Sequence, residues 1–234
     1  MERLDKILAG TGRWSRREVR DLVRAGRVTA GGAVARSADE RHEREGLDLR
    51  VDGERVLTPR FTYLMLHKPA GLVSATEDPR QPTVLELLPA HLRKIGLFPA
   101  GRLDKDTEGL LLLTNDGDLA HALLSPKRHV DKTYLVRVTG TLDGEDVKDF
   151  AGGMTLGDGY TCLPAVLEPL EEPGAALVTL REGKYHQIKR MLSARGKPVV
   201  YLKRLTIGTL KLDETLEAGK WRTLTETELQ ALKG

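Results

Sequence analysis

No apolar run in this chain is longer than about five residues. A helix that crosses a membrane needs about 20 apolar residues in succession, so we expect no membrane-bound state. A core made from such short runs must combine several brief strands with the apolar faces of amphipathic helices. With 234 residues, the chain is long enough to bury such a core in one large domain or two small ones.

Strand-like and helix-like segments are mixed along the chain beyond residue 60. The segments expected to form strands are 63–66, 110–113, 133–139, 176–180 and 199–202. Those expected to form helices are 83–92, 118–124 and 186–194. Because no βαβ unit repeats, we expect an α+β fold with a mixed, mainly antiparallel sheet flanked by helices.

The basic excess of the chain lies entirely in residues 1–60. These hold 14 Lys and Arg against 11 Asp and Glu, whereas residues 61–234 hold 23 of each kind. A solvated surface usually mixes both signs, but residues 13–36 carry seven arginines against two acids. This asymmetry favours contact with a polyanion such as RNA over a merely solvated helix face.

Local signals predict a small α/β-hairpin module at the N-terminus. Residues 2–9 have helical spacing, and a capping box from Ser15 to Glu18 starts a second helix that stops at Gly26. Residues 31–32 are both glycine and suit a tight hairpin turn. A charged connector with few large apolar residues follows from 36 to 60. We therefore expect two domains, 1–60 and 61–234.

The segments RLDK (3–6), SRR (15–17) and GRVT (26–29) resemble an S4 domain, a small RNA-binding module. The resemblance implies two helices followed by a short β-hairpin, which agrees with the local signals. The residues expected to contact RNA in this module are Arg3, Lys6, Arg13, Arg16, Arg17, Arg20, Arg24 and Arg27.

The densest polar cluster is the loop 101–109, directly before the apolar run at 110–113. A loop beside a buried strand is a rigid mount for a reactive group. It could be a solvated turn, or a metal or phosphoryl-transfer site built on Asp104 and Asp106. Lys105 between these carboxylates would weaken a cation site, so we expect no metal there.

No glycine-rich phosphate loop is present, so we expect no nucleotide cofactor. The single cysteine, Cys162, excludes a disulfide framework and a cysteine-rich metal site. Together with an N-terminus that lacks an apolar signal core, this predicts a cytoplasmic protein.

With the segments around it, the acidic loop resembles the signature of the pseudouridine synthases, in the branch named after ribosomal small-subunit synthase A. The matching segments are KPAG (68–71), GRLD (101–104), GLLLLTNDG (109–117), KTY (132–134), EGKYHQIKRM (182–191), IG (207–208) and GKWRTL (219–224). The resemblance implies that the C1′–N1 bond of a uridine in RNA is broken and the base rejoined through C5, without cofactor or metal.

The resemblance also implies roles for five residues. Asp104 is the essential carboxylate, and Lys189 is the cation that keeps it ionised in a buried pocket. The target base must be flipped out of the RNA, and Tyr134 would stack on it while Leu202 forms the apolar floor. Arg102 would hold the flipped nucleotide or the loop. Whether Asp104 attacks the base, attacks the sugar or removes a sugar proton stays open.

Residues 184–204 hold seven Lys and Arg and no acid. Since Lys189 and Arg190 are adjacent in a helix, both cannot enter the pocket, and we expect Arg190 to face RNA. The other residues of this stretch that could contact the RNA backbone are Lys184, Lys197, Lys203 and Arg204. We expect a structural hydrogen-bonding role for His186.

Segments 125–134 and 163–168 favour the small-subunit branch over relatives that act on 23S rRNA. That branch implies a single uridine of 16S rRNA, conventionally position 516, in free rRNA or a small-subunit assembly intermediate. We expect a monomer. The alternatives are a 23S rRNA pseudouridine synthase of the same family and a non-catalytic S4-type RNA-binding or ribosome assembly protein.

Overall fold

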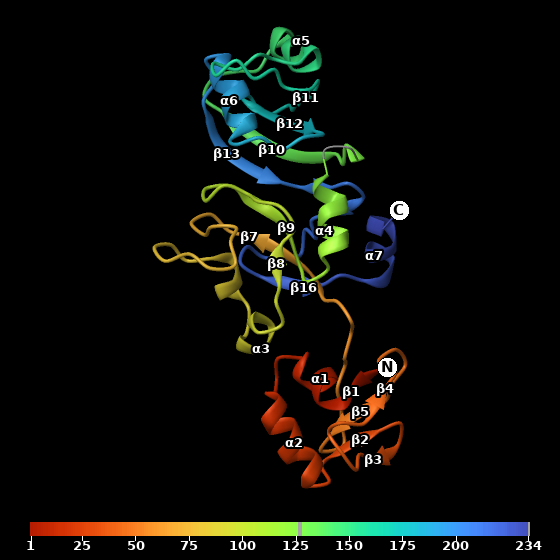
Figure 1. Ribbon diagram of the computed structural model, residues 1–234. Coiled ribbons are helices and arrows are strands. Elements are labelled where there is room, and N and C mark those ends of the chain that lie inside the picture. Colours follow the sequence, from red (N-terminus) through yellow and green to blue (C-terminus); the bar gives the residue numbers. More distant parts are fainter. Residues whose placement is uncertain (126–127, 234) are drawn as a thin grey trace. The chain divides into compact units, whose positions relative to one another are not determined.

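The computed structural model describes residues 1–125 and 128–233 (Figure 1). Segment 125–129, part of the small-subunit resemblance, therefore lies partly outside the described residues. The chain divides into two compact units. The N-terminal unit comprises Met1–Thr62 with Leu88–Leu97, and the C-terminal unit comprises the rest of the described chain. Within the described ranges, no helix is both long and apolar enough to cross a membrane.

The N-terminal unit packs two helices beside a four-stranded sheet in the order β3-β2-β5-β6. Its elements are β1 (Glu2–Arg3), α1 (Leu4–Ala9), α2 (Arg16–Arg24), β2 (Val28–Ala30), β3 (Ala33–Val34), β4 (Arg41–His42), β5 (Leu49–Val51), β6 (Glu54–Arg55) and, from the second segment, α3 (Ala90–Arg93). The core joins the apolar faces of both helices to Val28 of β2 and Leu49 of β5.

The local signals of this unit are confirmed. The backbone N–H of Glu18 donates to Ser15 Oγ at 3.2 Å, and that of Ser15 donates to Glu18 Oε2 at 2.6 Å, which completes the capping box. Gly31 and Gly32 turn the hairpin at φ angles of 60° and 84°.

The expectation that residues 36–60 form only a charged connector was wrong, because β5 lies within them and pairs with β2. β5 has only three residues, of which Leu49 and Val51 are buried and Arg50 is exposed. So short an alternation does not predict a strand from sequence.

The C-terminal unit is built on an eight-stranded sheet in the order β11-β12-β10-β13-β9-β7-β16, with β8 pairing to β9 (Figure 1). Its strands are β7 (Tyr63–Lys68), β8 (Phe98–Pro99), β9 (Glu108–Thr114), β10 (Lys132–Val138), β11 (Val166–Pro169), β12 (Ala175–Leu180), β13 (Val199–Arg204) and β16 (Trp221–Thr223). In the described sheet β13 runs parallel to β9 and the other neighbouring strands are antiparallel, which confirms the expected fold class.

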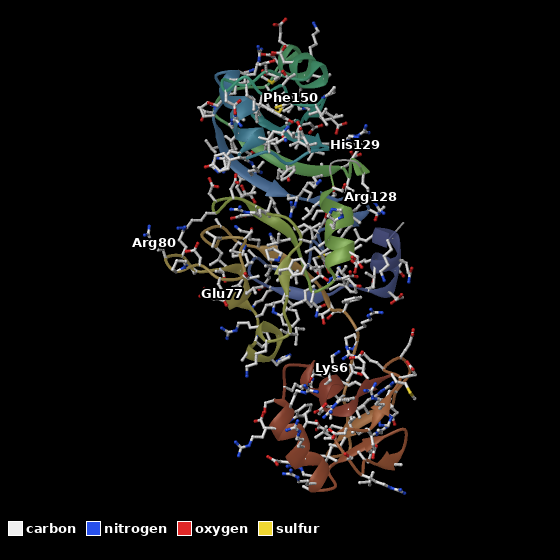
Figure 2. All side chains as sticks on the ribbon, viewed as in Figure 1. Lys6, Glu77, Arg80, Arg128, His129 and Phe150 are labelled. Atoms are coloured by element: carbon white, nitrogen blue, oxygen red, sulfur yellow. The ribbon has the colours of Figure 1, made fainter. Side chains whose placement is uncertain are left out.

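Helices and a small hairpin complete the C-terminal unit. They are η1, a 3₁₀ helix (Val84–Leu87), α4 (Gly117–Leu124), α5 (Gly144–Gly152), α6 (Gln187–Ala194), β14 (Thr206–Ile207), β15 (Leu210–Lys211) and α7 (Glu226–Lys233). Phe150 of α5, labelled in Figure 2, is completely buried. The single helix expected over 83–92 was wrong: η1 and α3 replace it. Pro89 has no amide hydrogen and disfavours helical geometry at Leu88.

Gly109 is where the parallel strands β9 and β13 approach most closely. Its φ angle is +103°, and a Cβ atom there would lie 2.2 Å from the carbonyl oxygen of Arg204. Only glycine fits this combination of backbone angle and contact. The close approach brings the acidic loop before β9 next to the end of β13.

We expect Gly109→Ala to lower the free energy of unfolding of the C-terminal unit by about 3 kcal/mol or more, through strain and steric overlap. Urea unfolding followed by Trp221 fluorescence in a Trp14→Phe background measures this. Gly117→Ala is the control, because Gly117 has open space and no positive φ. Equal stability of the two alanine variants would contradict the argument.

Candidate active site and RNA-binding residues

A pocket opens on one face of the central strands of the C-terminal unit. Tyr134 lies on β10 and Leu202 on β13, and the strand register places both side chains on the same face as Leu180 of β12. Tyr134 is 8% exposed and Leu202 is 6% exposed. The acidic loop and the N-terminal part of α6 close the pocket, which has an aromatic and aliphatic wall suited to a flat base.

Asp104 lines this pocket and is paired with a cation from α6. Its Oδ2 lies 2.9 Å from Nζ of Lys189, and its Oδ1 lies 3.5 Å from Nε2 of His186. Lys189 also contacts Asp106 at 2.5 Å, but Asp106 is 74% exposed, against 26% for Asp104. The structure therefore joins one sheltered carboxylate to one ammonium group beside a pocket whose apolar wall includes Tyr134 and Leu202.

The electrostatics of Lys189 favour its charged form. Burial acts to lower the pKa of Lys189, but hydrogen bonds to Asp106 and Asp104 outweigh it and raise that pKa above the ordinary value. The ammonium is therefore charged at neutral pH and supplies a fixed positive charge beside Asp104.

Lys68 holds the backbone of the acidic loop through hydrogen bonds. The sequence by itself assigned no role to this residue. Lys68 is fully buried at the end of β7. Its Nζ donates to the carbonyl oxygens of Pro69, Lys105 and Thr107 at 3.0, 3.2 and 2.8 Å. Burial lowers the pKa of Lys68 to about 8, against the attraction of nearby carboxylates. The sequence feature that could have indicated this role is a lysine at the end of an apolar strand, directly before Pro-Ala-Gly.

A second clamp fixes the residue before Asp104. The hydroxyl of Ser74 donates to the carbonyl oxygen of Leu103 at 2.9 Å, and the backbone N–H of Leu103 donates to Ser74 Oγ at 3.0 Å. In addition, the N–H of Gly71 donates to the carbonyl oxygen of Lys105 at 2.7 Å. Asp104 therefore projects from a backbone that is anchored on both sides.

The other expected site residues separate into two groups. Arg102 and Lys184 line the pocket, and Nζ of Lys184 lies 4.7 Å from the centre of the Tyr160 ring. Arg190 does not line it, because its guanidinium pairs with Asp158 at 2.5 Å. Lys197 is paired with carboxylates at the start of α5.

In the N-terminal unit, the buried carboxylate of Asp5 organises three of the basic residues expected to contact RNA. Asp5 accepts hydrogen bonds from Arg3 and from Arg16, and Nη2 of Arg20 lies 3.8 Å away. Burial alone would raise the pKa of Asp5, but Arg3 and Arg16 lower it to about 2. Asp5 is itself completely buried.

The other five basic residues of this set differ in whether they form ion pairs. Lys6, Arg24 and Arg27 have carboxylate partners in Glu2, Asp21 and Asp52, respectively. Arg13 and Arg17 are exposed and have no ion pair among the described residues. These two are the cations most available to RNA phosphates.

Comparison with known proteins assigns the chain to a family. Residues 62–194 match RNA pseudouridylate synthase, and residues 2–42 match the S4 domain. The chain belongs to the RNA pseudouridylate synthase family. It is 48% identical to an uncharacterized RNA pseudouridine synthase, YtzG, of Bacillus subtilis over 98% of both chains. It is 40% identical to ribosomal small subunit pseudouridine synthase A of Escherichia coli K12, over 98% of this chain and 99% of that protein.

A crystal structure of a pseudouridylate synthase matches with a TM-score of 0.70 and 36% sequence identity, covering 99% of this chain and 100% of the other. The protein is thus an RNA pseudouridine synthase with an N-terminal S4 domain. The region matched to the synthase family contains the Asp104 loop, Tyr134 and Lys189.

We expect Asp5→Asn to destabilise the S4 unit by about 2 kcal/mol at pH 7, since the pKa of Asp5 is about 2 against an ordinary 3.8. Because the pKa is lower in the folded state, this stabilisation is complete above about pH 4 and is lost as the pH falls toward 2. The wild type should therefore lose stability more steeply than the variant over that range. Trp14 fluorescence during urea unfolding, in a Trp221→Phe background, measures both effects; parallel pH curves would contradict them.

We expect Lys189→Met to slow pseudouridine formation about 10- to 100-fold, because a charge-assisted hydrogen bond contributes about 1.5–3 kcal/mol. Single-turnover kinetics at saturating enzyme isolates this effect from RNA affinity. Lys148→Met, which removes one charge from the exposed face of α5, is the control. Equal slowing by both substitutions would show that net charge, and not the Asp104 pair, is responsible.

Proposed function

We propose that this synthase converts one uridine of 16S rRNA, conventionally position 516, to pseudouridine. The substrate is free rRNA or a small-subunit assembly intermediate, and the enzyme acts as a cytoplasmic monomer. The target rests on similarity to proteins named ribosomal small subunit pseudouridine synthase A, which are 41% and 40% identical over 98% of this chain.

The observation that carries the chemistry is the pairing of Asp104 with Lys189 at a pocket that contains Tyr134. The reaction breaks the bond between C1′ and N1 and forms a bond between C1′ and C5. The proton displaced from C5 is balanced by the proton gained at N1, so no atom is lost and no electron is transferred. Asp104 is the group that acts on the base or the sugar.

The other pocket residues position the target. Extruding a nucleotide costs a few kcal/mol, which stacking on Tyr134 and contact with Leu202 would offset. Arg102 would hold the flipped nucleotide, because it lines the pocket and is exposed. Lys189 places its positive charge 2.9 Å from Asp104, where a bound base would exclude water.

RNA outside the pocket would be held by basic residues of both units. In the S4 domain these are led by Arg13 and Arg17, with the Asp5-organised arginines beside them. Lys184 lies at the pocket itself. Such phosphate contacts supply affinity that falls steeply with salt.

The decisive test maps pseudouridine to the nucleotide in unmodified 16S and 23S rRNA and in precursor particles. We expect one new pseudouridine in 16S material, at position 516. Asp104→Asn should abolish the product while retaining RNA binding. Asp106→Asn, in the same loop, should slow the reaction no more than about tenfold, because an exposed ion pair contributes about 0–1 kcal/mol.

Each of the other outcomes would overturn a different part of the proposal. A product in 23S rRNA alone would retain the chemistry and overturn the substrate. Tight binding by wild type and Asp104→Asn without any product would favour a non-catalytic RNA-binding or assembly protein. A greater loss of activity in Asp106→Asn than in Asp104→Asn would reassign the carboxylate.

A further inference from the structure

A second cavity of about 520 Å³ adjoins the pocket that contains Asp104. The two share Arg102, Tyr134 and Lys184 as lining residues. The second cavity is additionally lined by His129, which Figure 2 labels, and by Lys132 and Arg204. A nucleotide whose base contacts Tyr134 therefore has adjoining space for the backbone attached to it.

The strand register places two cations together on the wall of this cavity. Arg204 of β13 lies directly opposite Tyr134 of β10, and Lys132 is two residues before Tyr134 on the same strand. Side chains two apart on a strand share a face, as do those of directly opposed residues. Lys132 and Arg204 therefore lie on the face that bears Tyr134.

Both cations are buried and incompletely satisfied. Arg204 is 2% exposed; its Nε donates to the carbonyl oxygen of Leu110 at 2.8 Å, but Nη2 has no hydrogen-bond partner among the described residues. Lys132 is 9% exposed, and its Nζ donates to the carbonyl oxygen of Val130 at 2.9 Å. Burial, followed by the charge of Arg204, lowers the pKa of Lys132 against the weaker attraction of Asp131.

The acids close to this cavity are engaged by other groups. Glu182 accepts hydrogen bonds from the Tyr160 hydroxyl, the Leu163 N–H and the Gln187 amide. Asp131 pairs with Arg181 at 2.9 Å. Within the described part of the chain, no carboxylate forms an ion pair with Lys132 or Arg204. Two buried cations without a paired carboxylate are costly in free energy unless an anion joins them.

We propose that Lys132 and Arg204 form a binding site for one phosphodiester group of the RNA backbone, next to the flipped nucleotide. This inference rests on the proposed function for the identity of the RNA. The planar guanidinium matches the oxygens of a phosphate, and the ammonium adds a second charge-assisted contact. The phosphate would enter beside Tyr134, so base stacking and backbone binding would reinforce each other.

Inorganic phosphate, titrated calorimetrically at constant ionic strength against chloride, is the first probe. We expect Lys132→Gln to weaken phosphate binding about tenfold or more, as for the loss of one charge-assisted hydrogen bond. Lys148→Gln, an equal loss of charge on exposed α5, should bind phosphate as the wild type does. Equal affinity of the wild type and Lys132→Gln would overturn the site. Arg204→Lys, which keeps the charge but not the planar group, gives a second variant with an expected loss.

RNA with one neutral methylphosphonate linkage tests the phosphodiester itself. The probe is a 16S rRNA fragment around the proposed target, neutralised in turn at the linkage on either side of that uridine. At one of the two, the wild type should lose affinity about tenfold, and Lys132→Gln should show little further loss. Equal losses in both proteins, or no loss at either linkage in the wild type, would overturn the proposal.

These binding measurements are independent of turnover. Coupling between Lys132 and one linkage, without pseudouridine formation, would support the phosphate site and contradict the proposed reaction. Pseudouridine formation without such coupling would support the reaction and contradict the phosphate site.

Discussion

The buried ammonium of Lys68 holds the backbone that positions the Asp104 carboxylate. It donates to three carbonyl oxygens, two of them within the loop that carries Asp104. Burying this charge is costly, as its lowered pKa of about 8 shows, and carbonyl dipoles with neighbouring carboxylates offset the cost. Because Ser74 secures Leu103 as well, the direction of Asp104 is set before RNA binds. Such preorganisation is what an electrostatic role in catalysis requires.

The parallel pairing of β13 with β9 brings the remaining parts of the site to this loop. It requires Gly109, whose missing side chain lets the strands approach. The same pairing buries Arg204 beside Tyr134 and presents Leu202 to the pocket. One backbone contact thus connects the Asp104 loop, the Tyr134 ring proposed to stack on the base and the cation pair that we assign to the RNA backbone.

Charge is arranged differently in the two units. In the S4 domain the buried Asp5 orders several arginines and keeps them at the surface, while Arg13 and Arg17 have no ion pair among the described residues. In the described part of the synthase unit, the buried cations are Lys68, Lys132 and Arg204, and each donates to backbone carbonyl oxygens. The first arrangement suits non-specific attraction to phosphates, and the second suits one nucleotide held in one orientation.

The sequence by itself determined the features that depend on neighbouring residues: the capping box at Ser15, the glycine hairpin, most strands of the larger sheet, and the family to which the Asp104 loop belongs. Pro89 could also have been recognised as a helix breaker from sequence. Only the tertiary structure decided that β5 joins β2, that Lys68 supports the loop, and that Arg204 is buried. These outcomes depend on contacts between residues far apart in the chain, such as Lys68 with Thr107 and Gly109 with Arg204. A local sequence pattern does not predict which distant backbone atoms a buried charge will bind, or which distant strand will pack against a glycine.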